Sequence, residues 1–173
     1  MITQIKFGTD GWRAIIAKEF TVENVIRISV GASLYIKKNN LPKKVVIGHD
    51  CRFNGELFSL FAAKAFKHEG IEVVLAKGFV TTPMISFAAL QNNCGLGIII
   101  TASHNPKQWN ALKLLNQKGE FISAMDGEEV LKLSENPEIC FSEVDDLGTI
   151  TEDSNTINQH ISDIIGLKLV DKS

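Results

Sequence analysis

Short runs of apolar, mostly β-branched residues alternate along this chain with segments of helical periodicity. The runs at residues 45–48, 71–75 and 96–100 predict buried strands, and residues 111–115 predict an extended partner for the last of them. Strands joined by helices pair in parallel through right-handed crossovers. The pattern therefore predicts an α/β protein, a three-layer α/β/α fold with a mostly parallel (mixed) sheet of about four strands.

The ends of the expected helices carry capping signals. Thr21, Asn54 and Ser123 are expected to cap helices that end near residues 39, 69 and 135. Pro83 stands in the first turn of a further helix, where its missing N–H group is tolerated. These signals support the alternation of strand and helix.

The chain has 173 residues, 45% of them hydrophobic, which suffices for one buried core and a remainder. We expect residues 1–140 to form the α/β/α domain. The acidic, turn-rich stretch 142–155 predicts a linker, and an amphipathic helix rich in isoleucine follows it. Residues 141–173 are thus expected to lead toward a second domain that the chain does not contain.

The composition argues against several classes of partner. The formal net charge is −2, with 18 basic and 20 acidic residues, so no basic excess favours nucleic acid. No apolar run approaches the roughly 18 residues of a membrane helix, and the first residues lack the layout of a signal peptide. The 3 cysteines have no metal-binding spacing and are expected to be reduced. We expect a cytoplasmic protein with no nucleic-acid or membrane partner.

Two segments are expected at the carboxyl ends of buried strands, where open α/β sheets bind ligands. The more informative one is Thr-Ala-Ser-His-Asn-Pro at residues 101–106. Asn105 precedes a proline and is pushed toward an extended conformation, which presents Ser103 on a stiff, exposed loop. That hydroxyl could act as a nucleophile or a phosphate carrier near His104 and Lys113. Alternatively, Ser103 and Asn105 only complete turn hydrogen bonds.

Two further segments allow both a functional and a structural interpretation. Gly8 and Gly11 permit a tight loop before Arg13, whose guanidinium could hold an oxyanion or pair with a surface carboxylate. Asp50 and Arg52 follow a predicted strand, and we expect them to form an ion pair or to close the loop.

Several catalytic motifs are absent from the sequence. Ser103 and His104 are adjacent, so their side chains would diverge in an extended segment, and no G-x-S-x-G elbow surrounds the serine. No glycine-rich phosphate or dinucleotide fingerprint follows a predicted strand. The sequence therefore disfavours a serine hydrolase, a P-loop protein and a dinucleotide-binding enzyme.

Taken together, four motifs resemble the α-D-phosphohexomutase family, which includes phosphoglucomutase, phosphomannomutase and phosphoglucosamine mutase. They are, in order, Phe7-Gly-Thr-Asp-Gly-Trp-Arg13, Gly48-His-Asp-Cys-Arg52, Thr81-Thr-Pro83 and Thr101-Ala-Ser-His-Asn-Pro106. The last motif is the most specific, and the resemblance covers residues 5–135 well. It implies the α/β/α domain I of such an enzyme.

The resemblance implies a role for each matching residue. Ser103 matches the serine that carries the phosphoryl group as phosphoserine and gives an oxygen to Mg²⁺, whose remaining ligands are absent from this chain. Lys113 and Arg13 match active-site cations, and His104 and Asn105 belong to the serine loop. The residues of the first motif expected to bind substrate or shape its loop are Gly8, Thr9, Asp10 and Gly11.

The resemblance also implies a reaction. Hexose 1-phosphate and hexose 6-phosphate would interconvert through a hexose 1,6-bisphosphate, which serves as intermediate and activator. Trp12 and Thr101 look more like the glucose and mannose enzymes than phosphoglucosamine mutase. The second, third and fourth domains of the family, which hold metal and sugar, are missing, so we expect the isolated chain to be inactive. The alternative is a non-catalytic sugar-phosphate-binding or interaction module.

Two positions depart from the family pattern. Ala111 stands where a glycine is usual, and its side chain restricts φ and could shift the approach of Lys113. Cys51 stands where a hydroxyl residue is commoner. Neither change is expected to abolish the site.

Overall fold

The computed structural model describes residues 5–135, 150–167 and 169. Strands and helices alternate through most of this part of the chain, as the sequence predicts. In chain order they are β1 (Trp12–Ile15), α1 (Val22–Lys38), β2 (Lys44–His49), α2 (Gly55–His68), β3 (Glu72–Phe79), α3 (Thr82–Gln91), β4 (Leu96–Ile100), β5 (Trp109–Leu115), α4 (Ala124–Ser134), β6 (Glu152–Asp153) and α6 (Asn155–Gly166).

The strands form one six-stranded sheet in the order β1-β5-β4-β2-β3-β6. β2 pairs in parallel with β3 and with β4, and β6 pairs in parallel with β3. β5 runs antiparallel to both β4 and β1. The mostly parallel, mixed sheet is therefore confirmed, and it contains more strands than expected because β1 and β6 extend its two edges.

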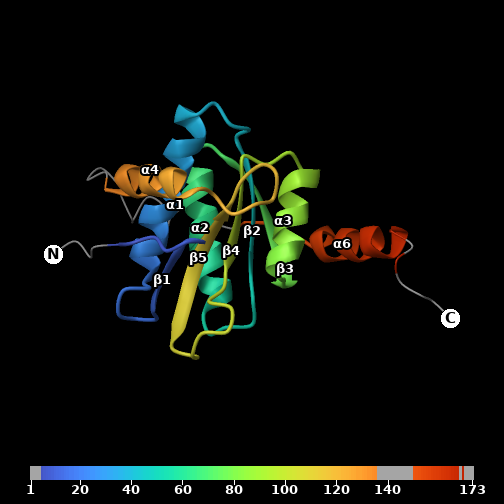
Figure 1. Cartoon of the computed structure of the whole chain (residues 1–173), viewed down its shortest axis with the longest axis horizontal. Coiled ribbons are helices and arrows are strands. Elements are labelled where there is room, and N and C mark those ends of the chain that lie inside the picture. The colour runs from blue at the N-terminus through green and yellow to red at the C-terminus, as the bar shows by residue number, and fades with distance from the viewer. Residues whose placement is uncertain (1–4, 136–149, 168, 170–173) are drawn as a thin grey trace.

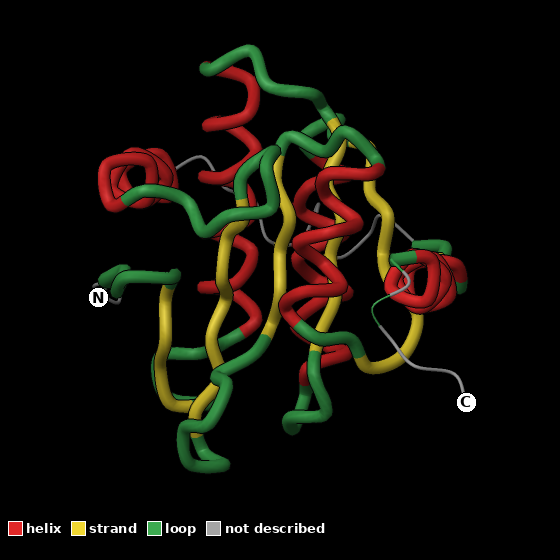
Figure 2. Tube along the Cα trace, turned by 45° about the vertical axis from the view of Figure 1, so that its right-hand side comes forward, coloured by secondary structure: helices red, strands yellow, loops and turns green. Residues whose placement is uncertain are grey.

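Both faces of the sheet are buried, because alternate residues of each strand point to opposite sides. Val45, Ile47 and Ile98 belong to a core cluster with residues of α1, α2 and α4, whereas Val46 and Ile99 belong to a second cluster with residues of α3. α6 packs beside α3 at one side of the molecule, and the strands stand side by side between the helices (Figures 1 and 2). Burial on two faces explains why the central strands are continuous apolar runs.

Two of the three predicted side-chain caps are confirmed. Thr21 Oγ1 accepts the N–H of Asn24 at 3.3 Å before α1, and Ser123 Oγ accepts the N–H of Asp126 at 3.1 Å before α4. Asn54 precedes α2, but its φ is +58° and its side chain makes no capping bond. The cap prediction is wrong there because Asn54 serves the turn instead, as an asparagine tolerates the left-handed backbone.

Neither edge strand is evident from the sequence. β1 begins inside the first glycine-rich motif, at Trp12, and pairs with β5. β6 contains only Glu152 and Asp153, which pair with Leu75 and Ala76 of β3. The end of the acidic stretch predicted as a linker therefore joins the sheet, while residues 142–149 lie outside the described residues.

The predicted isoleucine-rich helix is α6, and its apolar residues differ in burial. Ile157 packs against the second core cluster, whereas Ile161, Ile164 and Ile165 are 41–46% exposed. α6 contacts α3 and β3. Within the part of the chain that the structure describes, no helix is long and apolar enough to cross a membrane.

Candidate functional site

Residues 101–108, called the serine loop below, connect the carboxyl end of β4 to β5. Thr101 and Ala102 are buried, whereas Ser103 and His104 are exposed. Ser103 has a φ of +53°, in the left-handed region that serine rarely adopts. Such a conformation persists only where the surrounding structure holds it, so the contacts of the loop matter.

A chain of hydrogen bonds ties the backbone of Ser103 to the end of β2. Thr101 Oγ1 accepts the N–H of Ser103 at 3.0 Å and donates to Asp50 Oδ2 at 2.5 Å. The other carboxylate oxygen of Asp50 accepts the N–H of Arg52 at 2.9 Å. These residues meet because parallel pairing of β2 and β4 brings their carboxyl ends to the same edge.

The side chain of Arg52 anchors the serine loop. One terminal nitrogen donates to the carbonyls of Pro106 at 3.1 Å and Trp109 at 3.0 Å. The other donates to the carbonyls of Ser103 at 2.7 Å and Asn105 at 2.6 Å. The Arg52 side chain is only 14% exposed; its bonds to Trp109 and Asn105 are partly buried, whereas those to Pro106 and Ser103 are exposed. A single guanidinium thus fixes backbone on both sides of the loop.

The sequence indicates only part of this role. Nε of Arg52 lies 3.6 Å from Asp50 Oδ2, which confirms the expected ion pair. The carbonyl contacts are not predictable because backbone acceptors carry no residue-specific signal. The available signal was position alone, since the arginine follows a strand whose carboxyl end borders the strand leading to Ser103.

The hydroxyl of Ser103 lies 3.4 Å from Nδ1 of His104. The divergence expected for an extended segment does not occur, because the positive φ of Ser103 makes the segment a turn. Asn105 closes that turn, as its N–H and its side-chain amide donate to the carbonyl of Ala102 at 3.0 and 2.8 Å. The loop therefore presents an exposed hydroxyl on a backbone held from within.

Lys113, Asp10 and Arg13 form a second polar group, beside β5 and β1. Nζ of Lys113 lies 2.5 Å from Asp10 Oδ2, and the Arg13 guanidinium lies 3.8 Å from Asp10 Oδ1. The Lys113 side chain is 7% exposed, and its ammonium lies 5.3 Å from the centre of the Phe121 ring. A buried ammonium needs such a partner, whereas Arg13 is 40% exposed and accessible to an anion from solution.

Gly11 allows the first motif to lie against β5. Its φ is +140°, and a Cβ atom there would lie 2.3 Å from the carbonyl oxygen of Leu112 and 2.8 Å from Cα of Lys113. The N–H of Gly8 donates to the carbonyl of Gly11 at 2.7 Å and closes the turn, on which Thr9 is exposed. Of the two glycines predicted to permit a tight loop, Gly11 is the one that the close approach requires.

Strand pairing fixes how the two polar groups are related. The N–H of Thr101 donates to the carbonyl of Ala111 at 2.9 Å, and Ala111 pairs with Arg13 of β1. With a strand spacing of about 4.8 Å, Arg13 lies two strands and roughly 10 Å from the start of the serine loop. Lys113 pairs with Ile99, inside β4. Ala111, which replaces the usual glycine, pairs regularly with β1 and has no positive φ. It therefore does not shift Lys113, which keeps its pairing with Ile99.

His49, His68, Cys51 and Cys94 lie outside the serine loop and the group of Lys113, Asp10 and Arg13. His49 is buried at the end of β2, and His68 is the last residue of α2. Cys51 is exposed, and burial raises the pKa of the Cys94 thiol to about 11, which keeps it protonated. Cys140 lies outside the described residues.

The described residues do not by themselves form a Mg²⁺ site. Among them, no group of three or more His, Cys, Asp or Glu side chains converges to hold a metal ion. The carboxylate linked to the serine loop, that of Asp50, already accepts hydrogen bonds from Thr101 and Arg52. Mg²⁺ requires about six oxygen ligands, more than the Ser103 oxygen supplies.

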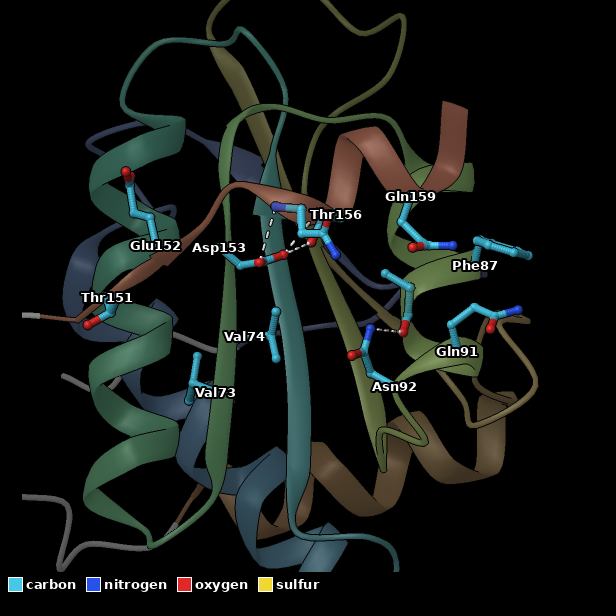
Figure 3. A pocket seen from close by; sticks show the side chains of 12 residues that line it. Val73, Val74, Phe87, Gln91, Asn92, Thr151, Glu152, Asp153, Thr156 and Gln159 are labelled. Atoms are coloured by element: carbon cyan, nitrogen blue, oxygen red, sulfur yellow. Dashed lines mark hydrogen bonds between the residues drawn. The ribbon is translucent and has the colours of Figure 1, made fainter. Parts of the chain in front are cut away.

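A hollow of about 590 Å³ lies between α3 and the pair β6 and α6 (Figure 3). Its lining includes Val74 of β3, Phe87 of α3 and Gln159 of α6. The carboxylate of Asp153 accepts the N–H and the hydroxyl of Thr156 at 2.9 and 2.6 Å and thereby begins α6. The hollow borders the amino-terminal half of β3, so it is separate from the serine loop.

Comparison with known proteins agrees with the motifs. The family described as phosphoglucomutase/phosphomannomutase, alpha/beta/alpha domain I, matches residues 4–138. A probable phosphoglucosamine mutase of Methanosphaera stadtmanae is 32% identical over 159 residues, which cover 92% of this chain and 34% of that protein. The phosphoglucosamine mutase of Alkaliphilus metalliredigens is 40% identical over 116 residues, which cover 65% of this chain and 25% of that protein.

A solved structure shows the same fold. A putative phosphomannomutase from Thermus thermophilus matches with a TM-score of 0.75 and 34% identity, over 78% of this chain and 30% of that chain. The chain spans about a third of the length of the curated relatives it matches. The matched residues 4–138 include the serine loop, Arg52, Lys113 and the first glycine-rich motif. The chain belongs to the phosphoglucomutase/phosphomannomutase family, of which it carries the alpha/beta/alpha domain I.

Proposed function

We propose that this chain supplies the phosphoryl-carrying serine of a phosphohexomutase, which interconverts hexose 1-phosphate and hexose 6-phosphate. The observation that carries the proposal is the exposed Ser103 hydroxyl, on a backbone that Arg52, Thr101 and Asn105 hold at a φ of +53°. A group that gives and takes a phosphoryl group has to be both accessible and closely positioned.

In the first half of the proposed reaction, a hydroxyl oxygen of the hexose phosphate bonds to phosphorus as the bond from phosphorus to Ser103 Oγ breaks. The hydroxyl proton passes to the Asp10 carboxylate that is bonded to Lys113. The departing serine oxygen takes a proton from His104, whose Nδ1 lies 3.4 Å away. The second half returns the other phosphate of the bisphosphate to Ser103 and reverses both proton transfers.

Binding of the sugar phosphate and of Mg²⁺ is proposed to need residues beyond this chain as well. Arg13 is exposed enough to bind a sugar phosphate beside the first motif. Mg²⁺ would be held by ligands outside the chain, with the Ser103 oxygen as the contribution from this domain. We therefore expect no turnover of hexose phosphate by the isolated chain.

The proposed sugar is glucose or mannose, with glucosamine as the second candidate. Trp12 and Thr101 favour the first two by resemblance, but both side chains are buried and Trp12 stacks on Phe20. Neither therefore touches a sugar. The curated relatives from Methanosphaera and Alkaliphilus are named phosphoglucosamine mutases, which favours glucosamine. Values of kcat/KM for the three hexose phosphates would identify the preferred substrate.

A chimera tests the function directly. This chain replaces the matching segment of the Thermus thermophilus protein, and conversion of hexose 1-phosphate is measured with Mg²⁺ and hexose 1,6-bisphosphate present. We expect turnover that Ser103→Ala abolishes and that the exposed control Thr151→Ala retains. A folded Ser103→Ala chimera with undiminished turnover would contradict the proposal. Turnover by the isolated chain would contradict the proposal that the remaining ligands of Mg²⁺ lie outside this chain.

A further inference from the structure

We propose that Arg52 is a positioning residue for phosphoryl transfer. By holding the carbonyls of the serine loop, it turns the N–H groups of His104 and Lys107 toward the side where a phosphoryl group on Ser103 is bound. This inference rests on the proposed function of Ser103, and it assigns the orientation of the surrounding backbone to a residue outside the serine motif.

The first step of the argument is peptide geometry. A trans peptide group is planar, and its carbonyl and the following N–H point in opposite directions. The structure has no cis peptide bond among its described residues. Arg52 donates to the carbonyls of Ser103 and Pro106 at 2.7 and 3.1 Å, so the N–H groups of His104 and Lys107 point away from the guanidinium.

The second step is electrostatic. The Arg52 side chain is 14% exposed, whereas Ser103, His104 and Lys107 are exposed residues, so we place the phosphoryl group on the side of the loop opposite Arg52. Hydrogen bonds to a charged donor polarise each peptide and leave its N–H end more positive. The N–H groups of Ser103 and Asn105 already donate to Thr101 Oγ1 and to the carbonyl of Ala102. The donors that we assign to the phosphoryl group are therefore those of His104 and Lys107, which follow the two carbonyls held by Arg52.

The third step concerns the chemical identity of the side chain. The two terminal nitrogens of Arg52 make four hydrogen bonds to backbone carbonyls. A planar guanidinium offers these donors in fixed directions, whereas lysine offers three donors from one point. Arg52→Lys therefore keeps the charge and loses the geometry. The two contributions can be separated by that variant.

Amide hydrogen exchange on the full 173-residue chain tests the effect on the loop. In Arg52→Lys, the N–H groups of Ser103, Asn105 and Trp109 should exchange at least about tenfold faster. The matched control is Arg27→Lys on α1, whose guanidinium bonds to Asn24; it should leave the loop unchanged. Unchanged loop exchange in a folded Arg52→Lys chain would overturn the inference.

Kinetics of the chimera test the effect on transfer. Arg52→Lys should lower kcat about 100-fold, because small misplacements of a reacting group have effects of that size. KM should change little, since Arg52 faces the loop and not the sugar. Equal kcat for Arg52→Lys and the parent chimera would overturn the inference. Failure of the parent chimera to use Ser103, with loop exchange responding as expected, would instead contradict the proposed function.

Discussion

The serine loop and the C-terminal edge, formed by β6 and α6, adjoin the same sheet but are held in different ways. The Arg52 guanidinium donates to three carbonyls of the serine loop and to the carbonyl of Trp109 at the start of β5, and the hydroxyl of Thr101 links the loop to the carboxylate of Asp50. The second depends on a two-residue strand and on a helix with partly exposed isoleucines, of which Ile157 packs inward.

The stronger contacts lie in the region that has to hold a costly backbone conformation. Hydrogen bonds to charged groups contribute about 1.5–3 kcal/mol each, more than neutral ones. The serine loop uses them to hold an exposed residue in a conformation that is costly by itself. The C-terminal edge holds no such conformation in its described residues, so we expect it to open at lower free energy.

The largest expected effect is on the turn that supports the serine side of the sheet. Gly11→Ala would place Cβ 2.3 Å from the carbonyl oxygen of Leu112 at a φ of +140°. We expect a loss of about 4 kcal/mol in the free energy of unfolding, measured in urea. Gly8→Ala is the matched control, because its Cβ would meet only the carbonyl of Gly11 at 3.7 Å. Equal stability of the two variants would contradict this account of the turn.

The next effect is on the hydroxyl link itself. Thr101→Val keeps the shape of the side chain but leaves the N–H of Ser103 and the carboxylate of Asp50 without that partner. We expect a loss of about 2 kcal/mol in urea unfolding. Thr101→Ser retains the hydroxyl and should keep most of the stability that Thr101→Val loses. A valine variant as stable as the parent would show that the link does not hold the loop.

Smaller effects are expected at the C-terminal edge, where α6 offers an internal comparison. Ile157→Ala removes a side chain that packs on the second core cluster and should lower stability by about 1.5 kcal/mol. Ile161→Ala changes a residue that is 46% exposed and should change stability by less than about 0.5 kcal/mol. Thermal unfolding with circular dichroism measures both. A larger loss at Ile161 would mean that α6 packs in solution through its other face.

The smallest effect is expected at the start of α6. Burial raises the pKa of Asp153, but hydrogen bonds from the side chain of Thr156 and from the N–H groups of Asn155 and Thr156 outweigh it and leave that pKa below its ordinary value. The stabilisation is therefore present above the ordinary pKa and is lost as pH falls through the lowered one.

Asp153→Ala should thus cost about 1 kcal/mol near neutral pH and progressively less in acid. Urea unfolding of the variant and its parent across the acid range measures the difference, with Thr151→Ala as the exposed neighbouring control. A difference that stays constant down to the lowest pH at which both chains fold would contradict the role of the carboxylate.

The fold was predictable where residues face a core on both sides. The strands β2 and β4 have continuous apolar runs, and their positions follow from the sequence. β6 was not predictable, because its two acidic residues join the sheet only through backbone pairing with Leu75 and Ala76. Asn54 had the right position for a helix start but a turn conformation that composition does not reveal.

In the candidate site, too, some residues were predictable from the sequence and their contacts were not. Ser103, Arg13 and Lys113 were predictable because their residue types occur in motifs that resemble a family. The role of Arg52 was not, since its acceptors are carbonyl groups and any residue has one. The pairing of Lys113 with Asp10 likewise depends on the contact between β1 and β5, which no local pattern encodes.

The central claim is that Ser103 carries the phosphoryl group from a position that Arg52 maintains. Its most direct test is peptide mass spectrometry of the chimera after brief exposure to hexose 1,6-bisphosphate and Mg²⁺, with quenching over a time series. The account predicts phosphate on Ser103, formed rapidly in the parent and in Arg27→Lys, about 100-fold more slowly in Arg52→Lys, and absent in Ser103→Ala. Phosphate on another residue, or equal rates in the parent and Arg52→Lys, would contradict it.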